Sequence, residues 1–442
     1  MRRMVHAGAL AAWACCAAWL LPGCEPSQTA RAQTPPRPPA GSGQRPATAP
    51  SIAEAPKAAA VAPAREATPA VAAETSTPSP TIRQMAAALR AAHAKAGSHL
   101  WFEVRLSSPA LATNMEGSDG TVTVGVHLPG QATACVTQAG RCWLAAYLPG
   151  FDGNPAQSYA AMGSNIAGVV DGLVKSGEIA PLVVVVPDPR TRLGGSFYVD
   201  SAASGLWQTF VMDEMLPAAR LAFVPSAGRS HTIALGHSMG GFGAMWLGLA
   251  RPDALRGVAG ISPVASSALA EEVLLPIVEA ARKGNNLQPD QYFDHPTTDH
   301  FFERLLLAMA QAFAPATQST HGLKLPFDPQ PHPWRFRAEV SAQFSRFDLV
   351  RVALEHGGAS ARKLERVFLA SGSKDRIIAV RYAEALAKSL RTACLPIADL
   401  RVALHDGSHG SRLRTDAADA LRFLMSDRPP ADARTTCAPS AP

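Results

Sequence analysis

The sequence predicts an α/β fold in which helices cover both faces of a mostly parallel sheet. Between about residues 100 and 427, short apolar runs alternate with helical segments. Several runs are continuous rather than alternating, which is typical of strands buried on both faces. The repeated order of strand, helix and strand favours parallel pairing with a helix packed on the sheet at each crossover. The continuous runs are Trp143–Leu148, Leu182–Val186, Thr232–Leu235, Val258–Ile261, Val367–Ala370 and Leu400–Leu404.

The elements that precede this core have different patterns. Apolar residues recur at helical spacing within Thr81–Gly97, which predicts a short amphipathic helix on the edge of the domain. Trp101–Leu106 and Thr121–Leu128 alternate apolar and polar residues, which predicts outer strands of antiparallel type. Further helices are expected at Tyr159–Lys175, Trp207–Ala222, Gly240–Ala250, Ala379–Arg391 and Ser411–Met425.

Residues 265–357 run between two core strands without a strand pattern of their own. We expect a largely helical insertion over the carboxyl ends of the strands, where ligands bind in open α/β sheets. An apolar stripe in this region is interpreted as core packing, with the wall of a substrate pocket as the alternative. The stripe consists of Phe302, Leu305, Leu306, Met309 and Phe313.

The amino terminus has the pattern of an export signal. Residues 1–6 contain two arginines, and residues 7–21 form an apolar stretch too short for a typical membrane-spanning helix. The stretch ends in Leu-Pro-Gly-Cys24, which resembles a bacterial lipobox. Residues 1–23 are therefore predicted to be a lipoprotein signal peptide, with Cys24 as the lipidated first residue. The alternative is ordinary cleavage after Ala32, which would give a soluble periplasmic or secreted protein.

The composition then divides the exported chain. Residues 24–80 are rich in Pro and Ala and contain almost no aromatic residues, which predicts a disordered tether. Residues 81–430 are predicted to form the globular domain, and residues 431–442 a tail. With Cys24 lipidated, the expected location is the bacterial cell envelope, with the protein an outer-membrane lipoprotein facing the periplasm or the exterior.

Charge and cysteine content exclude some classes of partner. The net charge is +6, and no basic run is interleaved with aromatic residues, so a nucleic-acid partner is not expected. No cysteine or histidine spacing fits a metal site. Once the signal peptide and Cys24 are set aside, an even number of cysteines is left, which suggests disulfides in an oxidising compartment. Of the three pairings, Cys135–Cys142 and Cys394–Cys437 are favoured, with free buried thiols as the alternative.

A candidate nucleophile lies between one buried strand and the helix that follows it. The segment Gly236-His-Ser-Met-Gly240 has the form Gly-x-Ser-x-Gly and separates Thr232–Leu235 from the helical segment after it. This context is that of a nucleophile elbow, in which glycines let strand and helix approach while the central serine is held exposed in a strained backbone. Ser238 is thus the predicted nucleophile.

Two later strands end in turns that supply the partners of a nucleophilic serine. A serine hydroxyl needs an imidazole to accept its proton and a carboxylate to orient that imidazole. Asp375 follows the strand at Val367, and His409 follows the strand at Leu400, in the order serine, acid, histidine. Asp406 and His405 are the rival acid and base. Asp406 is close in sequence to His409, and His405 stands at the strand end rather than in the turn.

An oxyanion hole requires two N–H groups that point at the developing negative charge. Met239, directly after the nucleophile, is expected to provide one. The second is expected after the Trp143–Leu148 strand, with Phe151 as the first choice and Asp152 as the reserve.

Taken together, these motifs resemble the esterase family that includes esterase D (S-formylglutathione hydrolase), enterochelin and feruloyl esterases and the mycolyltransferases. The resemblance covers about residues 100–427 and implies the α/β-hydrolase fold, no cofactor, and acyl-enzyme chemistry with a Ser238, Asp375 and His409 triad. It also places Tyr198 and Trp207 beside the active site, either lining the substrate pocket or packing near it. The matching segments are Tyr147–Gly153, Val184–Asp188, Gly194–Tyr198, Gly205–Pro217, Gly236–Ala244 and the turns of Asp375 and His409.

The sequence therefore predicts an exported serine esterase that acts through an acyl-enzyme on a small-molecule, glycan or lipid ester. One alternative is an acyltransferase, in which a sugar or lipid hydroxyl replaces water. The other is a non-catalytic envelope-binding lipoprotein on a hydrolase scaffold, which is disfavoured because no triad residue is missing.

Overall fold

The computed structural model describes residues 77–98, 100–130, 142–160, 163–282, 300–328, 332–355, 364–392 and 399–427. The predicted signal peptide, nearly all of the predicted tether and the tail lie outside these ranges, as do Cys24, Cys135, Cys394 and Cys437. The disulfide pairings accordingly stay predictions, although Cys142 is buried directly before a core strand. Within the described ranges, no helix is long and apolar enough to cross a membrane.

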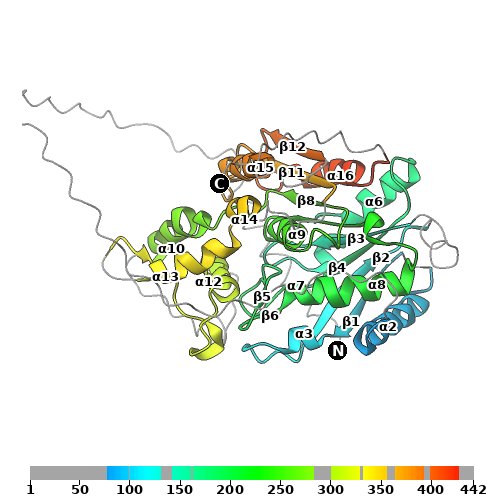
Figure 1. Ribbon diagram of the computed structural model, residues 1–442, viewed down its shortest axis with the longest axis horizontal. Coiled ribbons are helices and arrows are strands. Elements are labelled where there is room, and N and C mark those ends of the chain that lie inside the picture. The colour runs from blue at the N-terminus through cyan, green and yellow to red at the C-terminus, as the bar shows by residue number, and fades with distance from the viewer. Residues whose placement is uncertain are drawn as a thin grey trace, which may run out of the picture. The chain divides into compact units, whose positions relative to one another are not determined.

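A single eight-stranded sheet forms the centre of the domain, in the order β1-β2-β4-β3-β7-β8-β11-β12 (Figure 1). β2 is antiparallel to both of its neighbours, and the pairs from β4 to β12 are all parallel. This order and the single antiparallel strand define the α/β-hydrolase fold, which confirms the predicted fold class. The strands are β1 (Trp101–Ser107), β2 (Thr121–His127), β3 (Trp143–Leu148), β4 (Leu182–Pro187), β7 (Thr232–His237), β8 (Gly257–Ile261), β11 (Arg366–Gly372) and β12 (Asp399–His405).

The continuous apolar runs arise because the sheet is covered on both faces. Successive residues of β3 enter separate hydrophobic clusters, with Leu144 and Ala146 on one face and Ala145 and Tyr147 on the other. The first cluster includes residues of α2 (Pro80–Ala96), α8 (Leu216–Phe223), α9 (Met239–Ala250) and α15 (Val380–Thr392). The second includes residues of α6 (Ile166–Lys175) and α16 (Leu413–Leu424).

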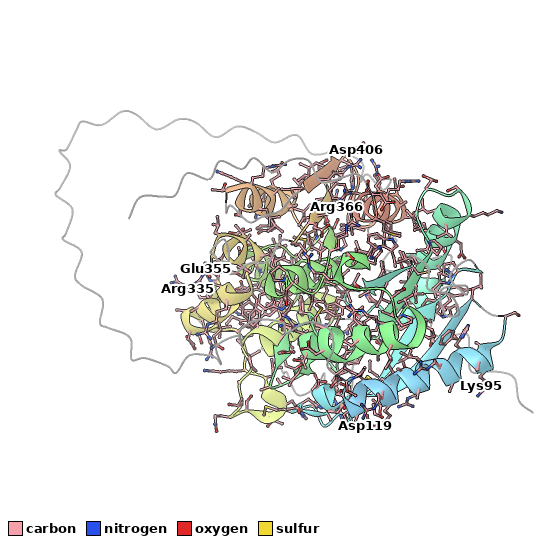
Figure 2. All side chains as sticks on the ribbon, turned by 45° about the vertical axis from the view of Figure 1, so that its right-hand side comes forward. Lys95, Asp119, Arg335, Glu355, Arg366 and Asp406 are labelled. Carbon is pink, nitrogen blue, oxygen red and sulfur yellow. The ribbon has the colours of Figure 1, made fainter. Side chains whose placement is uncertain are left out.

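Most of the charged side chains labelled in Figure 2 lie at the surface, but one of them lies in the core. Lys95, Asp119 and Asp406 lie at the outer edge of the molecule (Figure 2). Arg366, at the start of β11, is only 2% exposed, and its guanidinium lies 5.4 Å from the centre of the Phe423 ring. Its Nη1 also donates to the Phe423 carbonyl, so the buried charge joins the sheet to α16.

Several elements differ from the sequence-based expectation. β2 pairs on both sides, so only β1 is an edge strand at this end of the sheet. The helix expected at Tyr159–Lys175 starts at Ile166, because Asn165 has a left-handed backbone (φ 50°) that a right-handed helix cannot continue. Additional short elements are α3 (Pro109–Ala112), α5 (Pro155–Tyr159), η3 (Arg229–His231) and the hairpins β5 (Asp200–Ser201) with β6 (Gly205–Leu206) and β9 (Phe327–Asp328) with β10 (Arg335–Phe336).

The helix expected at Trp207–Ala222 is present and contains a π-helical segment. It comprises α7 (Trp207–Thr209), η2 (Phe210–Met215) and α8, which follow one another without a break. Such segments insert a residue into the helical ladder.

The described parts of the chain between β8 and β11 are largely helical, as expected, and α10, α12 and α13 gather at one side of the sheet (Figure 1). α12 is buried from Glu303 to Phe313, on every side of the helix, which is more than one apolar stripe would give. This burial favours the core-packing interpretation of the stripe. The elements are η4 (Ala270–Leu274), α10 (Leu275–Arg282), α12 (Phe301–Phe313), η6 (Thr320–Gly322), α13 (Ala338–Phe344), η7 (Ser345–Phe347) and α14 (Leu349–Glu355).

A buried carboxyl lies where α12 meets the loop before β2. Glu116 is 6% exposed, and its Oε2 accepts a hydrogen bond from the Arg192 N–H. Burial raises the pKa of Glu116 to about 7, although the hydrogen bonds from Arg192 and Gln311 oppose that effect. The carboxyl group therefore ionises near neutral pH at the cost of folding stability.

We predict that Glu116→Gln removes this pH dependence. Because the pKa is raised in the folded state, stability is full below the ordinary pKa of 4.5 and is lost as pH rises from there through about 7. The loss approaches about 1.4 kcal/mol per pH unit in that window. Urea unfolding at pH 5 and pH 8 should show a smaller difference for the variant than for the wild type. Equal differences would contradict the assignment.

Candidate active site

Ser238 occupies the sharp turn between β7 and α9. Its backbone has φ 58° and ψ −118°, a strained conformation for a residue with a side chain. Gly236 and Gly240 allow this turn, because a Cβ on Gly236 would lie 2.3 Å from the Gly240 carbonyl oxygen and one on Gly240 would lie 1.8 Å from that of Leu148. The strand, turn and helix predicted here are all present.

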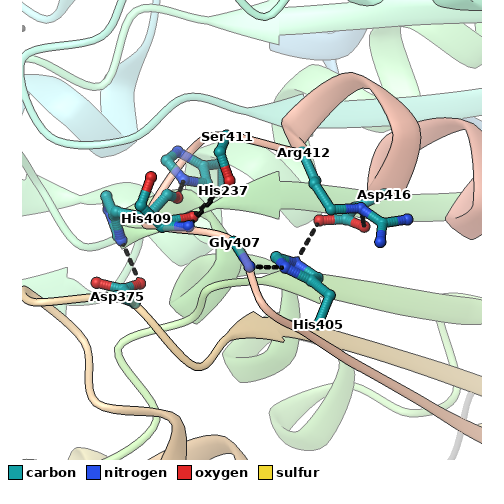
Figure 3. A network of polar contacts seen from close by, with 9 residues as sticks. His237, Asp375, His405, Gly407, His409, Ser411, Arg412 and Asp416 are labelled. Carbon is teal, nitrogen blue, oxygen red and sulfur yellow. Dashed lines mark hydrogen bonds and ion pairs between the residues drawn. The ribbon is translucent and has the colours of Figure 1, made fainter. Parts of the chain in front are cut away.

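His409 and Asp375 meet at the ends of the two last strands of the sheet (Figure 3). Nδ1 of His409 lies 2.7 Å from Oδ2 of Asp375, so the ring N–H donates to the carboxylate. The other carboxylate oxygen accepts from the Ile377 and Ile378 N–H groups, at 2.9 and 2.8 Å. Burial alone would raise the pKa of Asp375, but the hydrogen bond and charge of His409, with these two N–H groups, hold it below its usual value. Asp375 is thus ionised at neutral pH.

The rival residues occupy other positions. The side chain of Asp406 is 88% exposed at the molecular edge and lies 3.6 Å from Lys374 Nζ. The side chain of His405 is only 7% exposed and forms a separate pair, with its Nε2 3.1 Å from Oδ2 of Asp416. Its Nδ1 accepts from the Gly407 N–H at 3.0 Å, so Nε2 carries the hydrogen (Figure 3). His405 thereby fixes the start of the loop that carries His409.

A second histidine, His237, contacts the loop of His409 directly. Its Nε2 lies 2.6 Å from the carbonyl oxygen of His409, and the two ring centres are 4.7 Å apart. Because a carbonyl oxygen only accepts, Nε2 of His237 carries the hydrogen. Burial and the neighbouring His409 lower the pKa of His237 to about 3, so the ring is neutral. The sequence alone indicates no role for this residue, whose only signal is its place in the elbow.

The turn after β3 lies against the nucleophile. A Cβ on Gly150 would be 3.5 Å from the Cβ of Ser238. The Asp152 N–H donates to the Gly194 carbonyl at 2.9 Å and is unavailable to an oxyanion. Among the described residues, neither the Phe151 nor the Met239 N–H has a hydrogen-bond acceptor. Of the two residues considered in this turn, Phe151 therefore retains the free donor.

Tyr198 and Trp207 are both buried, at 0% and 5% exposure. The hydroxyl of Tyr198 donates to the Pro149 carbonyl at 2.8 Å, and burial raises its pKa well above the ordinary value, so it stays protonated. A Cβ on Gly243 would lie 2.3 Å from the tyrosine ring, which therefore packs directly on α9. Trp207 donates to the Ser204 carbonyl at 3.0 Å. These contacts favour packing over lining a pocket.

The described part of the chain contains no group of three or more His, Cys, Asp or Glu residues that could hold a metal ion. The chemical groups at this site are instead a strained serine, a histidine bonded to an ionised carboxylate, and two N–H donors. Such an arrangement can activate a hydroxyl and stabilise the oxyanion of a tetrahedral intermediate.

A family model described as "Putative esterase" matches residues 117–428. The match spans β2 to the end of α16, and so includes the elbow, the turn after β3 and the loops of Asp375 and His409. A search of curated proteins gives no match.

Solved structures of several esterases are similar to this chain. A ferulic acid esterase is 17% identical, with 74% of this chain and 97% of that chain covered and a TM-score of 0.48. The S-formylglutathione hydrolase of Agrobacterium tumefaciens is 17% identical, with 74% and 94% covered and a TM-score of 0.47. That of Staphylococcus aureus is 13% identical, with 74% and 100% covered and a TM-score of 0.45. Likeness at this level does not identify the ester that this chain cleaves.

The neutral state of His237 has a measurable consequence for stability. Its pKa is lowered to about 3 from 6.5, so the unfolded state binds a proton at a higher pH than the folded state does. The folded protein is therefore fully stable above about pH 6.5 and loses stability as pH falls towards 3. Between pH 6.5 and pH 5 the loss amounts to about 2 kcal/mol. His237→Gln keeps an N–H donor without this titration, and its stability should therefore fall less than that of the wild type. Urea unfolding at pH 7 and pH 5 measures the difference, and parallel losses would argue against a buried neutral ring.

Proposed function

The chain belongs to the Putative esterase family and is a carboxylic-ester hydrolase, and we propose that it acts through an acyl-enzyme formed on Ser238. The observation that carries this proposal is the 2.7 Å contact between His409 and Asp375, on two loops at the same end of the sheet as the Ser238 turn. In this proposal, the ends of three strands supply the nucleophile, the base and the acid that ester hydrolysis requires.

The proposed first step forms the acyl-enzyme. The Ser238 oxygen attacks the ester carbonyl carbon while Nε2 of His409 takes the hydroxyl proton. The ionised Asp375 keeps Nδ1 protonated and stabilises the imidazolium that forms. The carbonyl oxygen becomes an oxyanion and accepts from the Met239 and Phe151 N–H groups. Collapse of the intermediate breaks the bond to the alcohol, which leaves with the proton from His409.

The second step releases the acid. Water takes the place of the alcohol, and His409 removes its proton as the water oxygen attacks the acyl carbon. A second oxyanion forms at the same donors, and its collapse returns the proton to Ser238. The hydrogen bond between His409 and Asp375 therefore orients the imidazole in both acylation and deacylation.

We propose further that the protein is exported and held at the cell envelope by a lipid on Cys24. The support is the order of residues 1–24, in which a basic start and an apolar stretch precede Leu-Pro-Gly-Cys. In this proposal, the Pro- and Ala-rich residues 25–80 span the distance between membrane and enzyme.

We predict that Ser238→Ala lowers kcat on short-chain aryl esters by at least about 10³-fold, because the nucleophile is lost. Asp375→Asn should also lower kcat strongly, whereas Asp406→Asn, a matched change at an exposed acid, should leave it unchanged. Hydrolysis of p-nitrophenyl esters measures these rates, and a fluorophosphonate probe should label Ser238. Full activity in Ser238→Ala would refute the mechanism.

We predict that Cys24→Ser shifts the protein from the membrane to the soluble fraction, because the thiol that would carry the lipid is absent. Fractionation of cells that express the wild type and the variant measures this partition, and ester hydrolysis locates the folded enzyme in each fraction. An unchanged membrane fraction would count against the lipid anchor.

A further inference from the structure

A buried arginine of the insertion contacts the turn that holds the proposed oxyanion donor. Arg304 is 5% exposed on α12, and both of its terminal nitrogens donate to the Asp152 carboxylate, with Nη1 2.8 Å from Oδ1. Nη1 also lies 3.2 Å from the Leu193 carbonyl oxygen. A guanidinium that donates in parallel to one carboxylate fixes both distance and orientation. Arg304 therefore determines where the Asp152 side chain lies.

The same arginine joins two turns that are already in contact. Asp152 donates through its N–H to Gly194, and Arg304 donates to Asp152 and to the residue before Gly194. A Cβ on Gly194 would lie 2.4 Å from Oδ1 of Asp152 and 2.7 Å from Nη1 of Arg304, so only glycine allows this approach. The φ of Asp152 is 59°, a left-handed conformation that a non-glycine residue adopts when its surroundings impose it.

The side chain of Phe151 also contacts α12. The guanidinium of Arg304 lies 5.5 Å from the centre of the Phe151 ring. The ring of Phe301, at the start of α12, meets Phe151 edge to face with centres 5.3 Å apart. The backbone after Phe151 and the ring of Phe151 thus both depend on α12.

We infer that Arg304 is a positioning residue of the oxyanion hole, an inference that rests on the proposed esterase function. By fixing Asp152 and the Phe151 ring, it restricts rotation of the peptide that joins Gly150 to Phe151, so that the Phe151 N–H faces the site of the developing charge. An oxyanion donor acts through orientation, and a displacement of about 1 Å costs up to about 10²-fold in rate. The insertion is accordingly a part of the catalytic apparatus and not only a cover over it.

The chain offers a matched control, an arginine whose carboxylate partner is on the same helix as Arg304. Arg282 of α10 donates to both carboxylate oxygens of Glu303, at 2.6 Å each, and Glu303 is as deeply buried as Arg304. This ion pair also joins two parts of the insertion, but it does not involve the turn at Phe151. Arg282→Met thus reports the loss of a buried bidentate pair without the loss of the oxyanion contact.

The experiment compares Arg304→Met, Arg304→Lys, Asp152→Asn and Arg282→Met in the full-length protein. The fluorophosphonate probe counts folded sites, so that kcat is expressed per labelled Ser238. We expect kcat to fall by about 10- to 100-fold in Arg304→Met with KM little changed, because the oxyanion contact forms only in the transition state. Inhibition by an aryl trifluoromethyl ketone, which forms a tetrahedral adduct on the serine, should weaken by the same factor. Arg282→Met should lose thermal stability but keep both values.

Asp152→Asn covers the case in which Arg304→Met does not fold. Its side chain is 31% exposed, and the substitution keeps the shape and the N–H bond to Gly194 while it removes the charge that Arg304 holds. It should lower kcat and inhibitor affinity together, as should Arg304→Lys, which lacks the planar fork. Wild-type kcat in both Asp152→Asn and Arg304→Lys would overturn the inference about Arg304 and leave the proposed function intact. A wild type that neither hydrolyses esters nor reacts with the probe would overturn the proposed function, and with it the inference.

Discussion

The close approach of β7, α9 and the end of β3 is the constraint on which the site depends. Gly236 and Gly240 leave no room for a Cβ, and the backbone of Ser238 is left-handed between them. This strain is sustained because β7 and β3 pair in register and the hydrophobic clusters on both faces fix the sheet. The serine is therefore held at the carboxyl ends of the strands, where the loops that follow β11 and β12 begin.

The histidines around this turn have different tasks, and their surroundings keep them apart. His409 donates to an ionised carboxylate, whereas His237 is partly buried, neutral and hydrogen-bonded to the main chain of His409. His405 fixes the start of the same loop through Asp416. The carboxylate of Asp375 thus faces the base, and two further imidazoles hydrogen-bond the backbone of the loop that carries it.

The turn after β3, which contains Phe151, is also held by buried side chains, one of which comes from the insertion. Tyr198, which packs on α9, donates to the Pro149 carbonyl, and Arg304 of α12 donates to Asp152. The turn between them contains Phe151, whose N–H is free, while the N–H of Asp152 is not. Both of the residues that hold this turn are buried, so neither is positioned to meet a substrate directly.

Local sequence pattern is enough to predict the core strands and the turns that carry the candidate residues. Continuous apolar runs predict strands buried on both faces, and a serine, an aspartate and a histidine in turns after three such strands predict one site, because parallel strands end at the same edge. It did not place β2 inside the sheet, nor did it find His237 or Arg304. Arg304 is 152 positions from Asp152, and its place in an apolar helix marks it only as a charge in a core. Only tertiary packing decides which distant groups a buried charge contacts. The spacing of apolar residues shows which face of an element is buried, but it does not show which residues pack against that face.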